Sequence, residues 1–315
     1  MPDLWRKQTA QARVRDRRGS RARGSPSGHD RRPGTHHGLA TTILGAQVGM
    51  ATSLVLVAQP LTGEVIASLR LDAAYGAELI YASSLPAAAA HTLRVLGRSI
   101  WRGERPVLVP TGGSSALGNL GFVSAGLELA EQVRAGDLPE PAAVYIPVGS
   151  GGSAVGLLIG LKLAGLDTRV RGVLVTDLLA PSERSLARAA SATVRLLRRL
   201  SESVPPISIG PEDFQLLRNQ LGDGYGHPTQ QAEVAMGRAA QQGLRLDMTY
   251  SAKCLAALWE DVRQGVAPDG PIVFWNTFND IDVAGAAPGD PTTATLPPRI
   301  QELIDRAHGP VGATA

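Results

Sequence analysis

The stretch "AAVYIPVGSGGSAVGLLIGLKLAG" (142–165) decides the fold of this chain. An apolar run ends at Val148, five Gly and Ser residues follow, and a second apolar run then begins. This order is typical of a buried strand, a tight loop and a helix. Because the stretch contains six glycines and Lys162, we interpret it in this way rather than as a membrane span.

The same alternation of strand-like and helix-like segments continues on both sides. The strand-like segments are 51–60, 77–82, 106–110, 168–177 and 270–280. The helix-like segments are 39–50, 64–77, 121–136, 182–203, 228–243, 251–265 and 297–310. Strands that alternate with helices predict an α/β fold with parallel sheets covered by helices.

The composition supports a protein with a large apolar core and a mildly acidic body. The chain has 315 residues, 43% of them apolar, and a formal net charge of +3. Residues 1–34 hold 10 basic and 3 acidic residues, which leaves 21 basic and 25 acidic residues in the remainder. A body of this charge does not predict nucleic-acid binding.

The first residues and the cysteine content point to the cytoplasm. The start of the chain has basic residues but no apolar run of the kind that a signal peptide needs. The single Cys254 cannot form an internal disulfide and fits a reducing compartment. We therefore expect a cytoplasmic protein without a membrane partner.

Loops that directly follow strands are the candidate sites, because ligands in α/β folds bind at the carboxyl ends of the strands. The glycine loop, Gly149–Ser153, is the most informative of them. Glycines let a backbone approach an anion, and free N–H groups at a helix N-terminus bind phosphate. The hydroxyls of Ser150 and Ser153 add donors. The spacing matches neither GxGxxG nor the Walker pattern, and the alternative is a plain strand–helix turn.

Five further segments carry polar side chains. Residues 110–123 form a second Gly/Ser loop, and residues 222–229 place Tyr225 between glycines. Tyr250 and Ser251 stand just before a helix, where the serine could simply be a helix cap. Thr277 lies at a strand end. The paired histidines of "GTHHG" (34–38) suggest a metal, but no Cys or acid stands nearby with ligand spacing.

These segments, in this order, resemble the pyridoxal-phosphate (PLP) enzymes of the D-cysteine desulfhydrase and aminocyclopropane-carboxylate (ACC) deaminase family. Residues 110–130, 145–161 and 224–253 carry the resemblance, which runs from about Thr35 to about Asn279. It implies the fold type II architecture: two α/β domains, at about 35–120 and 121–315, with PLP between them. It also implies a homodimer.

The resemblance implies roles for the loop residues. The glycine loop, comprising Gly149, Ser150, Gly151, Gly152 and Ser153, looks like the cup for the cofactor phosphate. Thr277 looks like the partner of the pyridine nitrogen. Tyr225 and Tyr250 look like the active-site tyrosines, which face the substrate and its leaving group. Ser251 occupies a position that tunes substrate choice.

The "GTHHG" stretch aligns with the Ser-Asn-His motif of the family. His37 matches the motif, whereas Thr35 replaces the serine near the substrate carboxylate. His36 replaces the asparagine that contacts the phenolic oxygen of the cofactor. Thr35 keeps a hydroxyl, so it stays a candidate catalytic residue, and His36 a candidate cofactor contact.

The activity implied is PLP-dependent β-elimination with deamination of a small amino acid, for example D-cysteine to pyruvate, ammonia and sulfide. The cofactor supplies an electron sink for a carbanion, and a lysine normally holds it and moves protons. The family carries that lysine upstream, in Gly-Gly-Asn-Lys-x-Arg-Lys-Leu-Glu. No such motif occurs here, and Lys7 is the only lysine before residue 35.

The first segment fits a wrong-frame translation of a family gene. If the codons of residues 5–13 are read one base later, they can spell the lysine motif. Residues 29–32, "HDRR", can likewise spell Thr-Thr-Val-Val, which is a strand. We hypothesise that residues 1–34 are a disordered, wrong-frame segment and that the family frame resumes near Gly34, after a small deletion.

Two alternatives remain beside an active lyase. The chain could be a non-catalytic remnant of the family that lacks the lysine. Residues 1–33 could instead be a genuine basic arm for nucleic acid, which predicts steeply salt-dependent binding. The arm would explain the charge of the segment, but not its fit to the lysine motif.

Overall fold

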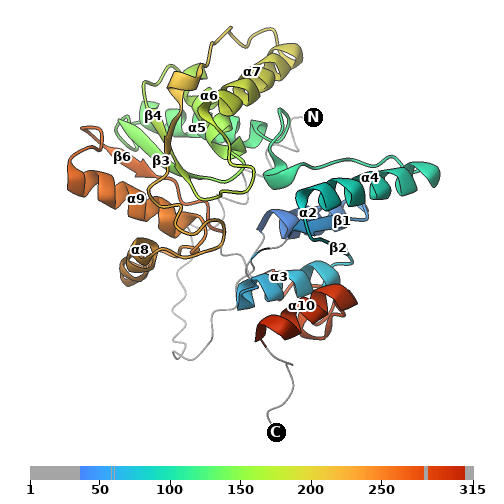
Figure 1. Ribbon diagram of the computed structural model, residues 1–315. Coiled ribbons are helices and arrows are strands. Elements are labelled where there is room, and N and C mark those ends of the chain that lie inside the picture. The colour runs from blue at the N-terminus through green and yellow to red at the C-terminus, as the bar shows by residue number, and fades with distance from the viewer. Residues whose placement is uncertain (1–35, 58, 60, 280–282, 309–315) are drawn as a thin grey trace. The chain divides into compact units, whose positions relative to one another are not determined.

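The computed structural model describes residues 36–57, 59, 61–279 and 283–308. All of these residues belong to one compact unit, which spans 32–315. This unit contains two parallel sheets with helices packed against them (Figure 1). The predicted α/β class is confirmed. The hypothesis about residues 1–34 lies outside the described residues.

The elements alternate as the sequence predicts. The helices are α2 (His36–Gln47), α3 (Gly63–Ala74), α4 (Leu85–Trp101), α5 (Leu120–Arg134), α6 (Gly152–Leu163), α7 (Glu183–Leu200), α8 (Gln230–Gln241), α9 (Ser251–Gln264) and α10 (Pro298–His308). The strands are β1 (Ser53–Val57), β2 (Glu78–Ala82), β3 (Ala143–Val148), β4 (Arg169–Leu174), β5 (Gln215–Leu217) and β6 (Ile272–Phe274). Single 3-10 turns lie at Thr111–Gly113, Pro211–Asp213 and Pro291–Thr293.

The larger sheet has the order β5-β4-β3-β6, with all neighbours parallel. Its strand β3 is fully buried, and its side chains alternate between two apolar clusters. Val144 and Ile146 contact the cluster formed with α6, whereas Ala143 and Tyr145 contact the cluster formed with α9. Helices therefore cover both faces of this sheet, as parallel sheets require.

Helices α5 and α6 pack closely because glycines line their contact. A Cβ atom on Gly156 would lie 2.4 Å from the carbonyl oxygen of Asn119, and one on Gly160 would lie 2.3 Å from that of Val123. Real Cβ atoms do not approach backbone oxygens this closely, so only glycine fits. This contact fixes the start of α6 relative to α5.

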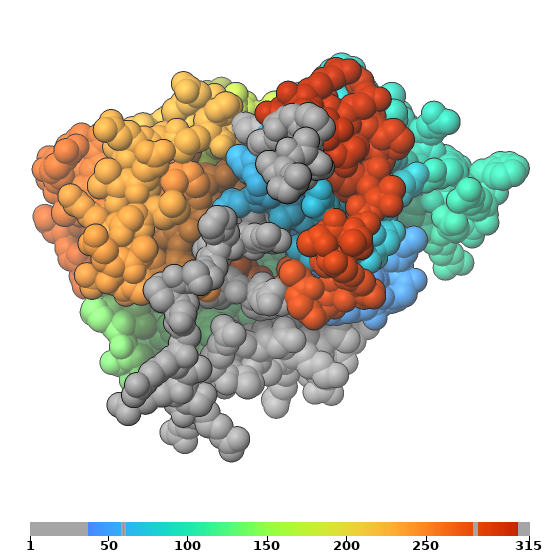
Figure 2. Space-filling model, turned by 90° about the horizontal axis from the view of Figure 1, so that it is seen from below, coloured from blue at the N-terminus to red at the C-terminus, as the bar shows by residue number. Residues whose placement is uncertain are grey.

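The smaller sheet consists of β1 and β2, which pair in parallel from Ser53↔Glu78 to Val57↔Ala82. One face packs on α3 and on α10, and Figure 2 shows the red surface of α10 beside the blue surface of α3. Helix α4 packs against β1 and β2 as well. All five residues of β1 are only half-buried.

Three segments differ from the expectations, and one of them, the three-residue strand β5, was not predicted. Helix α4 was not predicted, although Ser84 caps it and Pro86 stands in its first turn, both common helix-start signals. The strand predicted at 106–110 is wrong. This segment pairs with no strand among the described residues, and Val107, Leu108 and Val109 are exposed by 68%, 61% and 46%. Apolar residues form a strand only when a neighbouring strand can pair with them.

Candidate functional site

The glycine loop lies at the carboxyl end of β3, in the middle of the larger sheet. The strand ends at Val148 and α6 begins at Gly152. Between them Gly151 has a φ of 91°, which favours glycine because a Cβ atom is strained there. The predicted strand, loop and helix are confirmed, and the loop stands where ligands bind in α/β folds.

Neighbouring elements enclose the glycine loop so closely that side chains do not fit. A Cβ atom on Gly151 would lie 2.3 Å from Cδ2 of Leu186. A Cβ atom on Gly152 would lie 2.5 Å from Oγ of Ser114 and 2.7 Å from Oδ1 of Asn119. The loop is therefore held between α7 and the Gly/Ser loop before α5.

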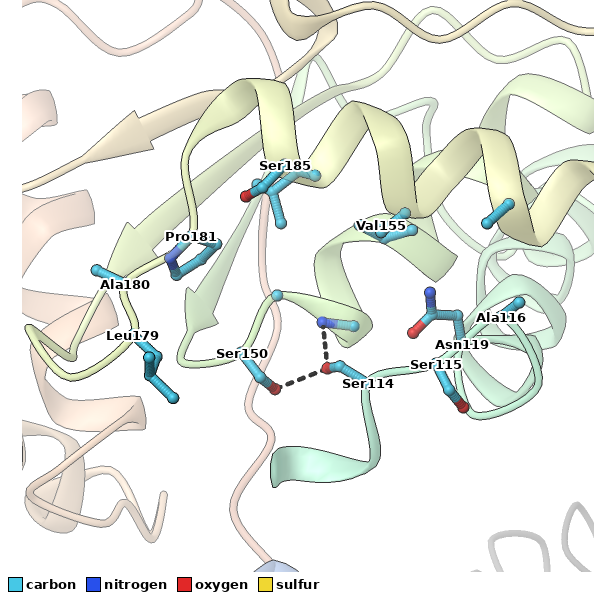
Figure 3. A pocket seen from close by; sticks show the side chains of 15 residues that line it. Ser114, Ser115, Ala116, Asn119, Ser150, Val155, Leu179, Ala180, Pro181 and Ser185 are labelled. Carbon is cyan, nitrogen blue, oxygen red and sulfur yellow. Dashed lines mark hydrogen bonds between the residues drawn. The ribbon is translucent and has the colours of Figure 1, made fainter. Parts of the chain in front are cut away.

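Hydrogen bonds tie the glycine loop to that second loop. The Gly152 N–H donates to Oγ of Ser114 at 3.0 Å, and Ser114 in turn donates to Oγ of Ser150 at 2.7 Å (Figure 3). Within the described residues the N–H groups of Ser153 and Ala154 have no acceptor. First-turn N–H groups of this kind are available to an anion.

A cavity of about 550 Å³ opens beside the glycine loop (Figure 3). Ser114, Ser150 and Asn119 contribute polar atoms to its wall. The amide nitrogen of Asn119 donates to Oγ1 of Thr193 at 3.0 Å, whereas its buried Oδ1 has no partner within the described residues. A volume of this size falls in the range of small-molecule sites. The cavity therefore offers a donor-lined loop and an unpaired acceptor.

The two predicted tyrosines meet each other next to the glycine loop. The hydroxyls of Tyr225 and Tyr250 lie 2.9 Å apart, and their rings meet edge-on. A Cβ atom on Gly149 would lie 3.3 Å from Cε1 of Tyr250, so this ring lies against the loop. Burial raises the pKa of both phenols above the ordinary value. Both hydroxyls therefore keep their protons at neutral pH.

Lys253 holds the loop that carries Tyr225. Its Nζ donates to the carbonyl oxygens of Leu221, at 2.9 Å, and Gly224, at 3.3 Å. The backbone N–H of Tyr225 donates to Oδ1 of Asp177 at 3.0 Å. Lys253 is wholly buried, and burial lowers the pKa of its ammonium group. Its contacts are those of a structural residue.

Ser251 is wholly buried at the first position of α9. Its hydroxyl donates to Oδ1 of Asp247 at 2.6 Å and accepts from the Asp247 N–H at 2.7 Å. The carboxylate of Asp247 also accepts from the N–H groups of Tyr250 and Ser251. Asp247 thus binds the backbone at the start of α9, where Tyr250 is the N-cap residue, and sequence reasoning missed this contact. The role of Ser251 in substrate choice stays a prediction.

Thr277 lies beyond β6, which neighbours β3 in the sheet. Because parallel strands share their carboxyl edge, Thr277 and the glycine loop belong to the same edge. Its side chain is exposed. This placement is compatible with contact to a ligand bound at the loop, and the assignment to the pyridine nitrogen stays a prediction.

The histidine stretch is described only in part. Thr35 and the side chain of His36 lie outside the described residues. A Cβ atom on Gly113 would lie 3.1 Å from Cε1 of His37, so the start of α2 adjoins the second Gly/Ser loop. Loss of water around the imidazole lowers its pKa, which a hydrogen bond to the Pro110 backbone partly offsets. No three metal-ligating side chains gather in the described part of the chain.

None of the described helices is both long enough and apolar enough to cross a bilayer. The site is thus built from loops at the carboxyl edge of a parallel sheet, with a helix N-terminus, two neutral phenols and a cavity. Such an arrangement has the donors that a small anionic molecule needs and a phenolic proton near them.

Comparison with known proteins identifies the class. Residues 35–277 match the sequence model of the family described as "Pyridoxal-phosphate dependent enzyme", and the chain belongs to this family. The fold also resembles a crystal structure of an ACC deaminase homologue, with a TM-score of 0.62 and 21% identity over 80% of this chain and 73% of that chain.

Curated relatives show which enzymes of this family the chain resembles in sequence. A D-cysteine desulfhydrase of Yersinia enterocolitica is 33% identical over 178 residues, which are 56% of this chain and 51% of the relative. A D-cysteine desulfhydrase of Serratia proteamaculans matches with the same identity and shares. The chain spans about half the length of the curated relatives it matches. The expected relationship to D-cysteine desulfhydrases and ACC deaminases is confirmed.

Sequence reasoning missed Ser114 and Asn119 as parts of the site. Both belong to the Gly/Ser loop at 110–123, which the sequence marks only as a second turn of this kind. The signal that could have found them is the repetition of the pattern. Two Gly/Ser loops that follow neighbouring segments of one α/β fold tend to meet at its ligand edge.

Proposed function

We propose that this chain derives from a PLP-dependent lyase or deaminase that acts on a small amino acid by β-elimination. Its similarity to proteins named D-cysteine desulfhydrase supports this proposal. The observation that carries the proposal is the contact of the glycine loop with the Tyr225–Tyr250 pair. In this contact Tyr250, whose hydroxyl meets that of Tyr225, lies near a helix start whose free N–H groups suit an anion. Membership of the PLP-dependent family supports the cofactor.

The described residues fit the phosphate of the cofactor. The free N–H groups of Ser153 and Ala154 and the hydroxyl of Ser150 would hold it at the start of α6. Thr277 would hydrogen-bond the pyridine nitrogen without fixing a full charge on it, which suits elimination better than transamination. When bound, PLP supplies an electron sink for the carbon next to the amino group.

The tyrosines would donate a proton to the leaving group. Because burial keeps both phenols protonated, the pair can present one O–H to a departing sulfur while the second phenol holds the first in place. Lys253 and Asp177 keep the Tyr225 loop in this position. Closure of the site against water would follow from the small distance between the rings and the glycine loop.

We infer that the lysine is the part of the chemistry that the chain does not supply, because none of its lysines stands in the motif of the family. The sequence holds Lys7, Lys162 and Lys253. Lys162 pairs with Asp213, and Lys253 is buried on two carbonyl oxygens, whereas Lys7 lies outside the described residues. Without an amine at the cofactor, the chain as written would be a disabled relative of the active enzymes.

The test compares the 315-residue chain with the chain whose first 33 residues are read in the shifted frame. We expect the shifted-frame chain to bind PLP covalently after borohydride reduction and to release sulfide from D-cysteine. We expect the written chain to be at least about a hundredfold slower, since a missing proton-transfer group costs about that much. The control is the shifted-frame chain with alanine in place of the lysine at position 8.

The outcomes separate the candidates. Full turnover by the written chain would refute the disabled-relative proposal. PLP binding without turnover in both chains would favour a non-catalytic PLP-binding protein. Resequencing the gene across the first 40 codons decides whether the shift is genuine, because codons that cannot spell the lysine motif would exclude the frameshift.

A further inference from the structure

Helix α7 has two faces of opposite character. One face packs on α6 and contributes Leu186, Ala190 and Val194 to the apolar cluster that it shares with β3 (Figure 1). The opposite face carries exposed arginines, which we call the arginine stripe: Arg184, Arg188, Arg195, Arg198 and Arg199. With about 3.6 residues per turn, these side chains fall within an arc of about 100°. The stripe is about 22 Å long, since helical residues rise about 1.5 Å each.

The arginine stripe has no counter-charge on the protein itself. Among the described residues, none is an ion-pair, hydrogen-bond or ring partner of these guanidinium groups. Glu183, the acid at the start of α7, pairs with Arg218 instead. On other helices, Arg98 and Arg299 pair with glutamates. The charge of the stripe is therefore left for solvent or for a partner.

The arginine stripe weakens the helix that carries it. Like charges three or four residues apart repel, and three such pairs occur within the stripe. Arg198 and Arg199 in the last turn gain from the helix dipole, whereas Arg184 in the first turn loses by it. A partner that supplies negative charge along the stripe would remove this repulsion.

The rest of the chain decides which polyanion fits. Residues 35–315 hold 21 basic and 25 acidic residues, so without the five arginines they hold 16 and 25, a balance of −9. This acidic remainder would repel a polyanion much longer than the stripe. Helix α7 has no aromatic side chain on which bases could stack, and its apolar side is packed and cannot enter a bilayer. These features favour a short acidic segment over nucleic acid or a membrane.

We propose that the arginine stripe of α7 is a docking surface for a short acidic segment of a partner protein. Carboxylates of the segment would accept paired hydrogen bonds from the exposed guanidinium groups. An extended segment of about seven residues matches the length of the stripe, since extended residues rise about 3.3 Å each. The proposal is independent of the proposed function, because no arginine of the stripe lines the cavity beside the glycine loop.

The test measures how tightly the full chain binds a labelled octaglutamate peptide, by fluorescence anisotropy at low and high salt. The stripe variant carries Arg188→Gln, Arg195→Gln and Arg199→Gln. Each exposed ion pair adds only a few-fold to affinity, so we expect this variant to bind the peptide about tenfold more weakly. Its melting temperature should be equal or higher, because the substitutions remove like charges that repel. Added salt should weaken binding by the original chain more steeply than binding by the variant.

The matched control removes the same charge from exposed arginines outside the stripe. It carries Arg94→Gln, Arg169→Gln and Arg263→Gln. We expect it to bind the peptide within about twofold of the original chain. A second control replaces the three stripe positions with lysine, which keeps the charge and should preserve most of the binding.

The outcomes decide both the surface and its occupant. Equal affinities for the original chain, the stripe variant and the matched control would overturn the proposal, because all three share the basic residues 1–34. Loss of binding in the lysine variant would also overturn it, since the charge is then unchanged. If duplex DNA or vesicles of anionic lipid bound the stripe more tightly than the peptide does, an acidic protein segment would be excluded as the occupant.

Discussion

Strands β1 and β3 are both short, apolar and parallel, but their surroundings differ. Strand β3 has β4 and β6 as neighbours and is buried along its whole length. Strand β1 has β2 on one side, no neighbour within the described residues on the other, and is half-buried. The difference teaches that the burial of an apolar strand depends on what the rest of the chain places on each side of it.

Buried polar groups differ between the two regions in the same way. Under β3, the Tyr145 hydroxyl donates to Oδ2 of Asp261 at 2.7 Å and accepts from Arg171 at 2.7 Å. Arg171 and Asp261 also form a buried ion pair at 3.1 Å. In α3, by contrast, both carboxyl oxygens of the wholly buried Asp72 lack a partner within the described residues. One substitution, Asp to Asn, therefore has opposite effects in the two regions.

The largest effect is expected for Asp261→Asn. This change removes the negative charge that faces Arg171 and leaves a cation buried without its partner. Loss of one member of a buried pair costs about 3–5 kcal/mol. The free energy of unfolding, measured in urea at neutral pH, should fall by that amount. A free energy of unfolding equal to that of the original chain would contradict this expectation. It would mean that water reaches Arg171 and takes the place of the lost charge.

The second effect is a gain of stability from Asp72→Asn. Burial raises the pKa of Asp72 to about 7, because the nearby Thr42 hydroxyl lowers it only partly and donates to the Gly38 carbonyl oxygen. The folded chain then keeps a proton that the unfolded chain loses near pH 4. The amide needs no such proton. We expect a gain of about 4 kcal/mol at pH 8, as an upper figure.

The pH dependence fixes the sign of this effect. Since the pKa of Asp72 is higher in the folded state, its contribution to stability is present below pH 4 and is lost as the pH rises to about 7. The free energy of unfolding, measured from pH 4 to pH 8, should therefore fall less steeply for Asp72→Asn than for the original chain. Parallel pH profiles would show that the carboxyl has a partner in solution.

The third effect concerns the close contact of α5 and α6. Gly160→Ala places a Cβ atom 2.3 Å from the Val123 carbonyl oxygen, so the helices must separate. Such overpacking costs about 1–3 kcal/mol. The control is Gly237→Ala in α8, whose Cβ would meet no atom within 4 Å and which should stabilise the helix by about 0.5–1 kcal/mol. Equal melting temperatures for the two variants would contradict the close contact.

The smallest effect is expected for Arg98→Ala. Arg98 of α4 pairs with Glu78 of β2 on the surface, and this pair holds the pKa of the Glu78 carboxyl below its usual range. Exposed ion pairs add little to stability. Thermal melts at low and high salt should coincide for the variant and the original chain. A clear loss of stability would contradict this expectation. It would show that α4, which has no buried residue, depends on this ion pair for its place against β2.

Strands β3, β4 and β6 of the larger sheet could be predicted because each carries its own signal, whereas the three-residue strand β5 was missed. The run from Ala143 to Leu163 alternates buried strand, glycine loop and helix within one continuous stretch. The segment Val107–Val109 has equally apolar residues, but its strand depends on a partner that local sequence does not reveal. Helix α4 was missed because its alanine-rich start resembles a linker more than an amphipathic helix.

The glycine loop and the tyrosine pair could be predicted, since both stand in loops after or between regular elements. The structure brings them together as expected. The contacts of Ser114 and Asp247 could not be predicted, because each depends on a residue that the fold brings to it. Asp72 could not be predicted as an unpaired carboxyl, since sequence shows an acid on a helix but not what covers it.

The contact of α10 with α3 sets an order of folding. Leu296, Ile300 and Ile304 complete the apolar cluster that Val65 and Leu69 begin. During synthesis α3 leaves the ribosome long before α10, so this cluster stays incomplete until α10 has been made. The larger sheet has no such dependence on α10. It can form first and serve as the anchor on which the earlier part of the chain later closes.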